Sequence, residues 1–166
     1  AYAVLHAGAT RDYKKWPRAY YAQLARQLRQ AGMQVVFIGA KSDAQETAQV
    51  LSVLAQDGGT TGVFDATNQF TLPELAGFLC QARCMVGNDS GPFHLATALG
   101  VKGVVIYGPT NVDLWRPLGS SVRVLQHASQ CSPECSRTQC LFDHVCLKSI
   151  SPGDVMTALR DLSVVA

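Results

Sequence analysis

The chain has 166 residues, of which 48% are hydrophobic and 16% are charged, and its formal net charge is +2. This length and composition fit one globular domain with a substantial core and exclude a disordered chain. The small net charge and the lack of a Lys/Arg run argue against nucleic-acid binding, and no apolar stretch reaches the roughly 18 residues of a transmembrane segment.

Six short apolar runs predict β-strands, at residues 3–6, 35–39, 62–64, 84–87, 104–107 and 122–125. The runs are almost continuous in apolar residues, which is typical of strands that are buried on both faces of a sheet. The chain opens directly on the first of these strands. We therefore expect a piece of a longer protein, and a natural terminus tied into the sheet is the alternative.

Helical patterns lie between and after these strands, at residues 16–31, 44–56, 71–82, 92–99 and 151–162. Pro17 and Gly32 mark the two ends of the first helix, and Thr71 and Glu74 have the spacing of a capping box. Strands that alternate with helices predict an α/β fold, a Rossmann-like parallel sheet with helices on both faces. We interpret residues 1–166 as a single such domain, with a Cys-rich loop at about 127–148 before the C-terminal helix.

The segments that follow the predicted strands are rich in Gly, Ser, Thr, Asp and Lys. They read HAGATRDYKKWP, GAKSD, DATNQF, NDSGPFH and GPTNVDLW. Ligands of open α/β sheets bind beyond the carboxyl ends of the strands, so these segments meet at one rim. Small residues let backbone N–H groups approach a phosphate, and a helix N-terminus favours an anion. The rim therefore predicts a site for a phosphate and a sugar.

The segment NDSGPFH carries the strongest signal of this kind. Ser90 and Gly91 form a predicted tight turn after Asp89, and His94 lies in the first turn of the next helix. The serine and histidine can donate to phosphate oxygens, and the carboxylate can accept from sugar hydroxyls. The alternative is that Asp89 or Ser90 merely caps the helix. The segment is not a G-x-S-x-G nucleophile elbow, because Asn88 replaces the first glycine, and no G-x-G-x-x-G motif indicates NAD.

Four segments, in order and in spacing, resemble the C-terminal domain of glycosyltransferase family 9, the lipopolysaccharide heptosyltransferases. They are KKWPRAYYAQLARQLRQAG, VVFIGAKSD, VGNDSGPFHLATALGV and VVIYGPTNVDLW, and the resemblance covers about residues 4–160. It implies that this chain is the donor-binding half of a GT-B enzyme. The N-terminal acceptor domain of such an enzyme would then be absent from this chain. It also implies inverting transfer from an ADP-heptose-like donor to a lipopolysaccharide core sugar, in the cytoplasm or at the cytoplasmic face of the inner membrane, with no cofactor or metal.

The resemblance also implies roles for individual residues. Lys14 and Asp89 are expected to be catalytic, with the lysine on the donor's phosphate and sugar and the carboxylate on sugar hydroxyls. Asp43 is expected to bind the ribose, although family members often have Glu there and a helix cap is the alternative. The other expected substrate-binding residues are Thr10, Ser90, Gly91 and His94 at the diphosphate, and Gly108, Pro109 and Thr110 in a loop that closes the pocket or forms an ordinary turn.

The family's general base has no match in this chain. We therefore expect the isolated chain to bind the donor weakly and not to turn it over. Two alternatives remain at this point: a non-catalytic nucleotide- or phosphate-binding module, and a transferase that uses a different nucleotide-hexose donor.

The cysteines fall into two groups. Cys80 and Cys84 are predicted to be small buried core residues. The segment 131–146 has the spacing C-x3-C-x4-C-x5-C, which is not a standard pair of C-x2-C zinc knuckles. A zinc site, disulfides and free thiols all remain open for Cys131, Cys135, Cys140 and Cys146, and His127 and His144 could contribute to a metal site.

Overall fold

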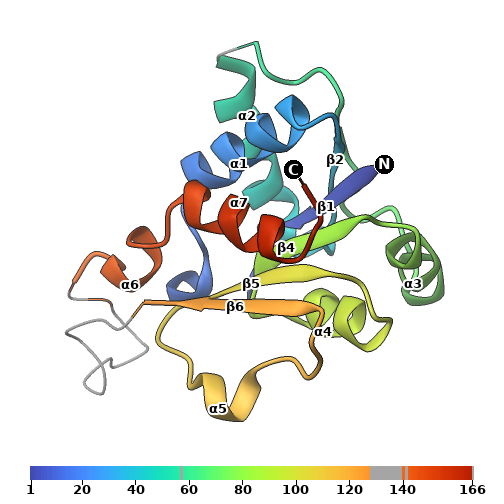
Figure 1. Ribbon diagram of the computed structural model, residues 1–166. Helices are drawn as coiled ribbons and strands as arrows, with labels where there is room; N and C mark the ends of the chain where they lie inside the picture. The colour runs from blue at the N-terminus through green and yellow to red at the C-terminus, as the bar shows by residue number, and fades with distance from the viewer. Residues whose placement is uncertain (57, 128–139, 141, 166) are drawn as a thin grey trace.

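The structure, a computed structural model, describes residues 1–56, 58–127, 140 and 142–165. Its centre is a six-stranded parallel sheet in the order β3-β2-β1-β4-β5-β6 (Figure 1). The strands lie within two residues of the predicted ranges, which confirms the Rossmann-like fold class. Their bounds are β1 Tyr2–His6, β2 Gln34–Phe37, β3 Val63–Asp65, β4 Cys84–Asn88, β5 Gly103–Tyr107 and β6 Val122–Gln126.

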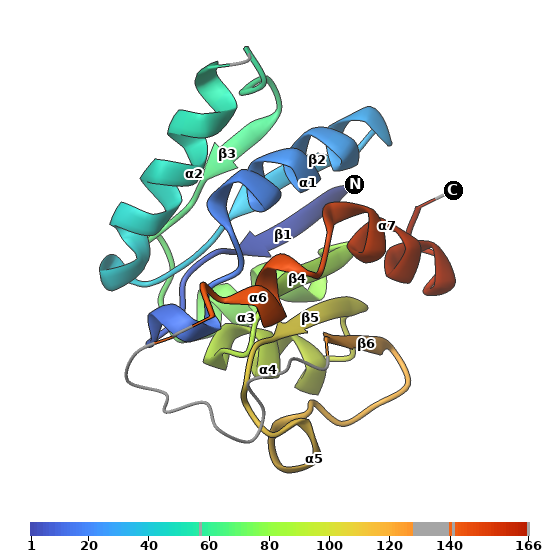
Figure 2. The ribbon, with the colours of Figure 1, turned by 90° about the vertical axis from the view of Figure 1, so that its left-hand side faces the viewer.

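Helices cover both faces of this sheet. One face packs against α1 (Arg18–Gln30), α2 (Ala44–Gln56), α6 (Val145–Lys148) and α7 (Pro152–Asp161). The other face packs against α3 (Leu72–Cys80) and α4 (Gly91–Ala98). Figure 2 shows the strands stacked from β3 at the top to β6 at the bottom, with α1, α2 and α7 along the first face.

Alternation along β1 explains how one strand contributes to both layers. Leu5 packs with the cluster that contains α1 and α7, whereas Val4 packs with Phe93 of α4 and Leu79 of α3. Successive side chains of a strand point to opposite faces, so a strand buried on both faces must be apolar at every position. This is the physical basis of the continuous apolar runs in the sequence.

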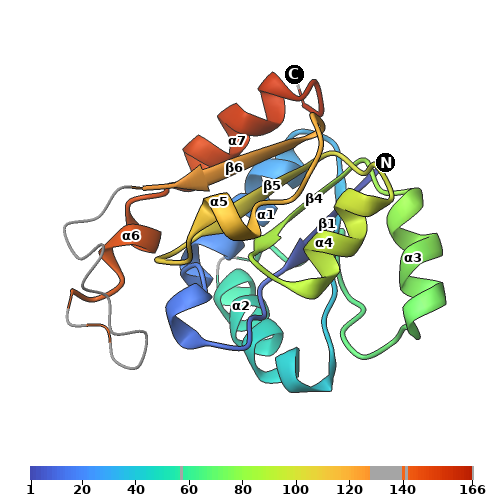
Figure 3. The same cartoon turned by 90° about the horizontal axis from the view of Figure 1, so that it is seen from below.

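Four short segments were not predicted: η1 (Asp12–Lys14), η2 (Lys41–Asp43), α5 (Val112–Trp115) and α6. Each has three or four residues, which is too short for a periodic pattern of apolar positions to appear. Two of them, η1 and η2, lie in the loops after β1 and β2, and α5 lies over β5 and β6 when the molecule is seen from below (Figure 3).

Cys80 and Cys84 were both predicted to be buried, and the prediction is wrong for Cys80. Cys84 begins β4 and is fully buried, and this burial raises the pKa of its thiol to about 12. Cys80 is exposed, because it is the last residue of α3 and lies off the face that packs on the sheet. Among the described residues, no helix combines the length and the apolar character needed to span a membrane.

The chain reverses its direction of travel across the sheet between β1 and β4. From β1 it runs outward through β2 to β3, and it then returns to place β4 on the other side of β1. The connections after β1 and after β4 leave on opposite faces, toward α1 and α4. A crevice forms at such a switch point, at the carboxyl ends of the two strands.

The side chain of Asn88 joins the two sides of this switch. It is fully buried at the end of β4, where its Oδ1 accepts from the Trp16 N–H at 3.0 Å. Its Nδ2 donates to the carbonyls of Ala7 and Gly8 at 3.0 and 3.1 Å. One amide therefore holds the loop after β1 against β4.

Replacement of Asn88 by Ala should lower the free energy of unfolding by about 2–4 kcal/mol, because one buried N–H and two carbonyls lose their partner. Urea unfolding followed by circular dichroism measures this loss. Gln45→Ala, at an exposed position of α2, is the matched control and should stay within about 0.5 kcal/mol of the native chain. An Asn88 variant as stable as this control would contradict the prediction.

Candidate functional site

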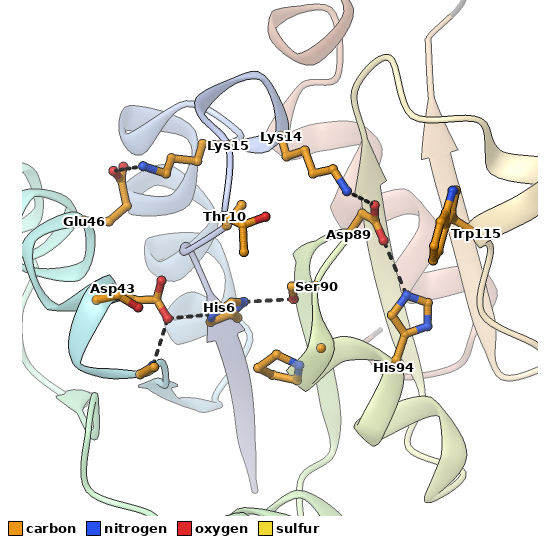
Figure 4. Close-up of a pocket in the computed structure, with 15 residues that line it drawn as sticks. His6, Thr10, Lys14, Lys15, Asp43, Glu46, Asp89, Ser90, His94 and Trp115 are labelled. Atoms are coloured by element: carbon orange, nitrogen blue, oxygen red, sulfur yellow. Dashed lines mark hydrogen bonds and ion pairs between the residues drawn. The ribbon is translucent and has the colours of Figure 1, made fainter. Parts of the chain in front are cut away.

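A cavity of about 750 Å³ opens at the carboxyl ends of β1, β2 and β4, at the switch point (Figure 4). Its size is that of a typical small-molecule site. The lining residues come from the end of β1, the segments that follow β1, β2 and β4, the first turns of α2 and α4, and α5. They are His6, Ala9, Thr10, Lys14, Lys15, Ala40, Ser42, Asp43, Glu46, Asp89, Ser90, Gly91, Pro92, His94 and Trp115.

Most of the site residues expected from the sequence meet in this cavity. Lys14, Asp89, Thr10, Asp43, Ser90, Gly91 and His94 all line it.

The loop of Gly108, Pro109 and Thr110 does not line it. Gln126 of β6 donates to the carbonyls of Gly108 and Thr110, and a Cβ at Gly108 would lie 2.6 Å from the carbonyl oxygen of Tyr13. The loop is therefore held between β6 and the η1 segment, and Trp115 of the following α5 reaches the cavity instead.

Asp89 is the centre of one half of the cavity. Its Oδ2 accepts a hydrogen bond from the Lys14 ammonium at 2.6 Å, and its Oδ1 lies 3.4 Å from His94 Nε2. Only 7% of the Asp89 side chain is exposed, against 21% for Lys14. Lys14 is thus fixed toward the cavity and is not a solvated surface lysine. Asp89 is paired with these two side chains and is not acting as a helix cap.

His6 is the centre of the other half. The imidazole is buried, with its Nδ1 3.0 Å from Ser90 Oγ and its Nε2 3.3 Å from Asp43 Oδ2. Ser90 stands at the N-cap position of α4 but makes no side-chain capping bond, because its hydroxyl faces His6. No motif in the sequence indicated a role for His6. Its signal is a polar residue at the last position of an otherwise apolar strand.

Asp43 has two partners in the structure, a backbone N–H and His6, and its expected role at the ribose stays a prediction. Its Oδ2 accepts from the Ala40 N–H at 2.8 Å, so the side chain caps η2, and the same oxygen faces His6. The hydrogen bond with His6, with a further contribution from the Ala40 N–H, lowers the pKa of Asp43 below its ordinary value. The residue is therefore a carboxylate at neutral pH.

Two glycines make room for this carboxylate. A Cβ at Gly8 would lie 2.2 Å from Asp43 Oδ1, and one at Gly39 would lie 2.8 Å from Asp43 Cβ. Real Cβ atoms do not approach other atoms this closely, so both positions require glycine while Asp43 keeps its place. The loops after β1 and β2 are thereby shaped around one side chain.

A third acidic side chain, Glu46 of α2, lies at the far end of the cavity. Arg18 donates to both of its carboxylate oxygens, at 2.5 and 2.9 Å, and Lys15 Nζ lies 3.5 Å from Oε2. Lys15 also lines the cavity, and it donates to Asp12 at 2.8 Å. The hydrogen bond from Lys15 to Asp12 raises the pKa of the lysine.

An aromatic side chain completes the rim. Trp115 is 59% exposed and lies beside His94 in Figure 4. Its position is fixed through its backbone, because the Tyr107 hydroxyl donates to the Trp115 carbonyl at 2.6 Å. Burial, together with the nearby Asp89 carboxylate, raises the pKa of Tyr107, so this hydroxyl stays a donor.

The possible metal site of the Cys-rich loop falls largely outside the described residues, since Cys131 and Cys135 are not among them. The Sγ of Cys140 accepts a hydrogen bond from the His144 N–H at 3.0 Å. Within the described ranges, no three His, Cys, Asp or Glu side chains are grouped so that they could bind a metal ion.

Comparison with known proteins gives consistent matches. The family described as glycosyltransferase family 9 (heptosyltransferase) matches residues 1–145. Lipopolysaccharide heptosyltransferase 2 of Escherichia coli K12 is 32% identical over 113 residues, which cover 68% of this chain and 32% of the relative. Lipooligosaccharide heptosyltransferase 2 of Campylobacter jejuni is 26% identical over 90% of this chain and 47% of its own length.

Solved structures agree at the level of the fold. The structure of E. coli ADP-heptose lps heptosyltransferase II superposes with a TM-score of 0.83 at 28% identity, over 96% of this chain and 45% of that chain. E. coli heptosyltransferase WaaC with ADP gives 0.77 at 22% identity, over 97% and 44%. The chain thus spans 32–47% of the length of these relatives.

The pairing of Asp43 predicts a pH-dependent contribution to stability. The pKa of Asp43 is lowered in the folded chain. Its contribution to stability is therefore complete above about pH 4, the ordinary pKa of aspartate. The contribution is lost as the pH falls through the lower pKa that Asp43 has in the folded chain. Asp43→Asn should lower the urea midpoint at pH 7, and the difference should narrow as the solution is acidified. Asp161→Asn, at the exposed end of α7, is the control. A difference that stays constant with pH would contradict this account.

Proposed function

Because the chain belongs to glycosyltransferase family 9, we propose that it is the donor-binding half of an inverting heptosyltransferase of lipopolysaccharide core biosynthesis. In this proposal the cavity at the carboxyl ends of β1, β2 and β4 binds the diphosphate and sugar of an ADP-heptose-like donor.

The observation that carries this proposal is the cluster around Asp89. A lysine, a histidine and the N-terminus of α4 converge on one wall of a cavity at a switch point of the sheet. Helix N-termini and positively charged side chains favour phosphate, and the buried carboxylate among them can accept hydrogen bonds from sugar hydroxyls.

The arrangement supports a specific division of labour. Lys14 would exchange part of its contact with Asp89 for a phosphate oxygen, and would stabilise the charge that develops on the leaving nucleoside diphosphate. Asp89 would orient the sugar ring. Asp43, whose Oδ2 already has two partners, would use Oδ1 for a ribose hydroxyl. Thr10 and Gly91 would contact the phosphates.

The rest of the reaction belongs to the part of the relatives that this chain does not span. We propose that this part supplies the lipopolysaccharide acceptor and the base that removes the proton of its hydroxyl as that oxygen attacks the anomeric carbon. The longer protein would then work in the cytoplasm, at the inner face of the inner membrane. ADP is the first nucleotide to test, since one of the structural neighbours, WaaC, was solved with it.

Titration calorimetry should show that the chain binds ADP more tightly than UDP. Lys14→Gln should weaken ADP binding by about tenfold or more, because one charged hydrogen bond to phosphate is lost. Asp89→Asn should keep ADP binding but lose the preference for the sugar-bearing donor over ADP. Lys148→Gln, which removes an exposed lysine from α6, is the charge-matched control.

Three outcomes of this titration separate the possibilities. Equal binding of ADP and UDP would favour a different nucleotide-hexose donor. Tight binding with no preference for any sugar would favour a non-catalytic module. ADP affinity that is unchanged in Lys14→Gln would remove the diphosphate from this wall of the cavity.

The chain alone should give no heptose transfer from ADP-heptose to a lipopolysaccharide core acceptor, because the proposed base is not within it. Release of ADP, measured with a coupled assay, should stay at the rate of the acceptor-free control. Transfer above that background by the chain alone would show that the base lies in these 166 residues.

A further inference from the structure

The ring of His6 is a buried link between two parts of the proposed donor site. It lies at the end of β1 with 3% of its surface exposed, and both ring nitrogens face a polar partner. One partner, Asp43, comes from the loop after β2, and the other, Ser90, comes from the loop after β4. The link connects the proposed ribose contact with the proposed diphosphate contact.

The chemistry of the two partners determines which ring nitrogen of His6 carries a hydrogen. Asp43 is ionised and accepts only, so Nε2 of His6 must carry the hydrogen that points toward it. In a neutral imidazole the other nitrogen, Nδ1, is then an acceptor. The hydroxyl of Ser90 must donate to it, and Ser90 Oγ offers the cavity only lone pairs. In this state the lone pairs of Ser90 Oγ would repel a phosphate oxygen.

Protonation of the ring reverses one of these hydrogen bonds. An imidazolium donates from both nitrogens, so Nδ1–H would donate to Ser90 Oγ and release the hydroxyl hydrogen toward the cavity. Ser90 would then donate to an anionic ligand. The proton comes from solvent, no covalent bond to carbon or phosphorus changes, and Asp43 balances the new positive charge.

The charges that line the cavity give this step a driving force. Two lysines and three carboxylates line the cavity, and one of these carboxylates, Glu46, is also paired with Arg18. The cations and carboxylates of these described residues therefore balance when the histidines are neutral, and they leave no excess positive charge for a ligand. Both lysines already contact carboxylates. A diphosphate entering such a site would be stabilised by one more positive charge.

Several ionisable groups surround His6 and must be separated from it in any test. The nearest is Asp43, and the Tyr21 hydroxyl of α1 donates to the His6 carbonyl at 2.9 Å. The others line the same cavity from η1, α2 and the start of α4; they are Lys14, Lys15, Glu46, Asp89 and His94.

We propose that His6 is a positioning residue that takes up a proton when a nucleoside diphosphate binds, and that this proton turns Ser90 from a donor to His6 into a donor to the ligand. The inference rests on the proposed function, because it requires that the cavity bind a diphosphate. It adds a proton-linked step and one residue, His6, which acts as a unit with Ser90.

Long-range ¹H–¹⁵N spectra of the histidine side chains provide the direct test, with the His6 signals assigned by comparison with His6→Gln. Without ligand at neutral pH, His6 should be the neutral tautomer with its proton on Nε2. With saturating ADP, both nitrogens should be protonated. A ligand-free ring with its proton on Nδ1, or a ring that stays neutral with ADP bound, would overturn the proposal.

Calorimetry in buffers of different ionisation enthalpy provides the second test. The native chain should take up protons as ADP binds, and its dissociation constant should rise by up to about tenfold per pH unit within the histidine range, roughly pH 5 to 8. His6→Gln should lose most of this uptake and flatten the pH dependence. His94→Gln should weaken binding but keep the uptake, which separates the two histidines.

Ser90→Ala keeps the test decisive if His6→Gln does not fold. It leaves the ring and Asp43 in place but removes the hydroxyl, so it should bind ADP more weakly at low pH and approach native affinity at high pH. Unchanged proton uptake in His6→Gln, or an unchanged pH dependence in Ser90→Ala, would overturn the proposal. A chain that does not bind ADP at any pH would instead overturn the proposed function.

Discussion

The site depends on one topological constraint, the parallel pairing of β1 with β4. These strands are 78 or more residues apart in the chain, yet His6 at the end of one pairs directly with Gly87 near the end of the other. Since their connections leave on opposite faces of the sheet, a crevice opens at the carboxyl ends of these two strands. Asn88 ties the loop after β1 back to β4 at this crevice.

Within this opening, the buried and half-buried acidic groups are paired before any ligand arrives. Asp89 holds Lys14 and His94, Asp43 holds His6, and the carboxylate of Glu46 accepts from Arg18. Buried charges are costly unless they are paired, and pairs of this kind fix side-chain positions. A ligand can then exchange one partner for another without reordering the site, which is the condition for electrostatic preorganisation.

The close packing of the site also explains two glycines that have no chemical role of their own. Gly8 and Gly39 are required because the Asp43 carboxyl fills the place where their side chains would be. The similarity that shows the family and the fold extends over most of the chain. The site is more local, because it depends on how three loops from distant parts of the sequence close around the carboxylates of Asp43 and Asp89.

The sequence by itself determined the class of fold, the strands and the rim on which the site lies, because apolar runs, helix caps and glycine turns are local signals that each segment carries alone. It also indicated the turn at Ser90, since helix N-termini and small residues have a direct relation to phosphate. Lys14 and the expected catalytic role of Asp89 came from the resemblance of the motifs to the family. Only the tertiary structure placed His6 between Asp43 and Ser90, which are 37 and 84 residues away from it in the chain. It likewise brought Lys15 to the cavity wall and replaced the loop 108–110 by Trp115. Such contacts are set by the packing of loops against one another, and no spacing along the chain encodes them.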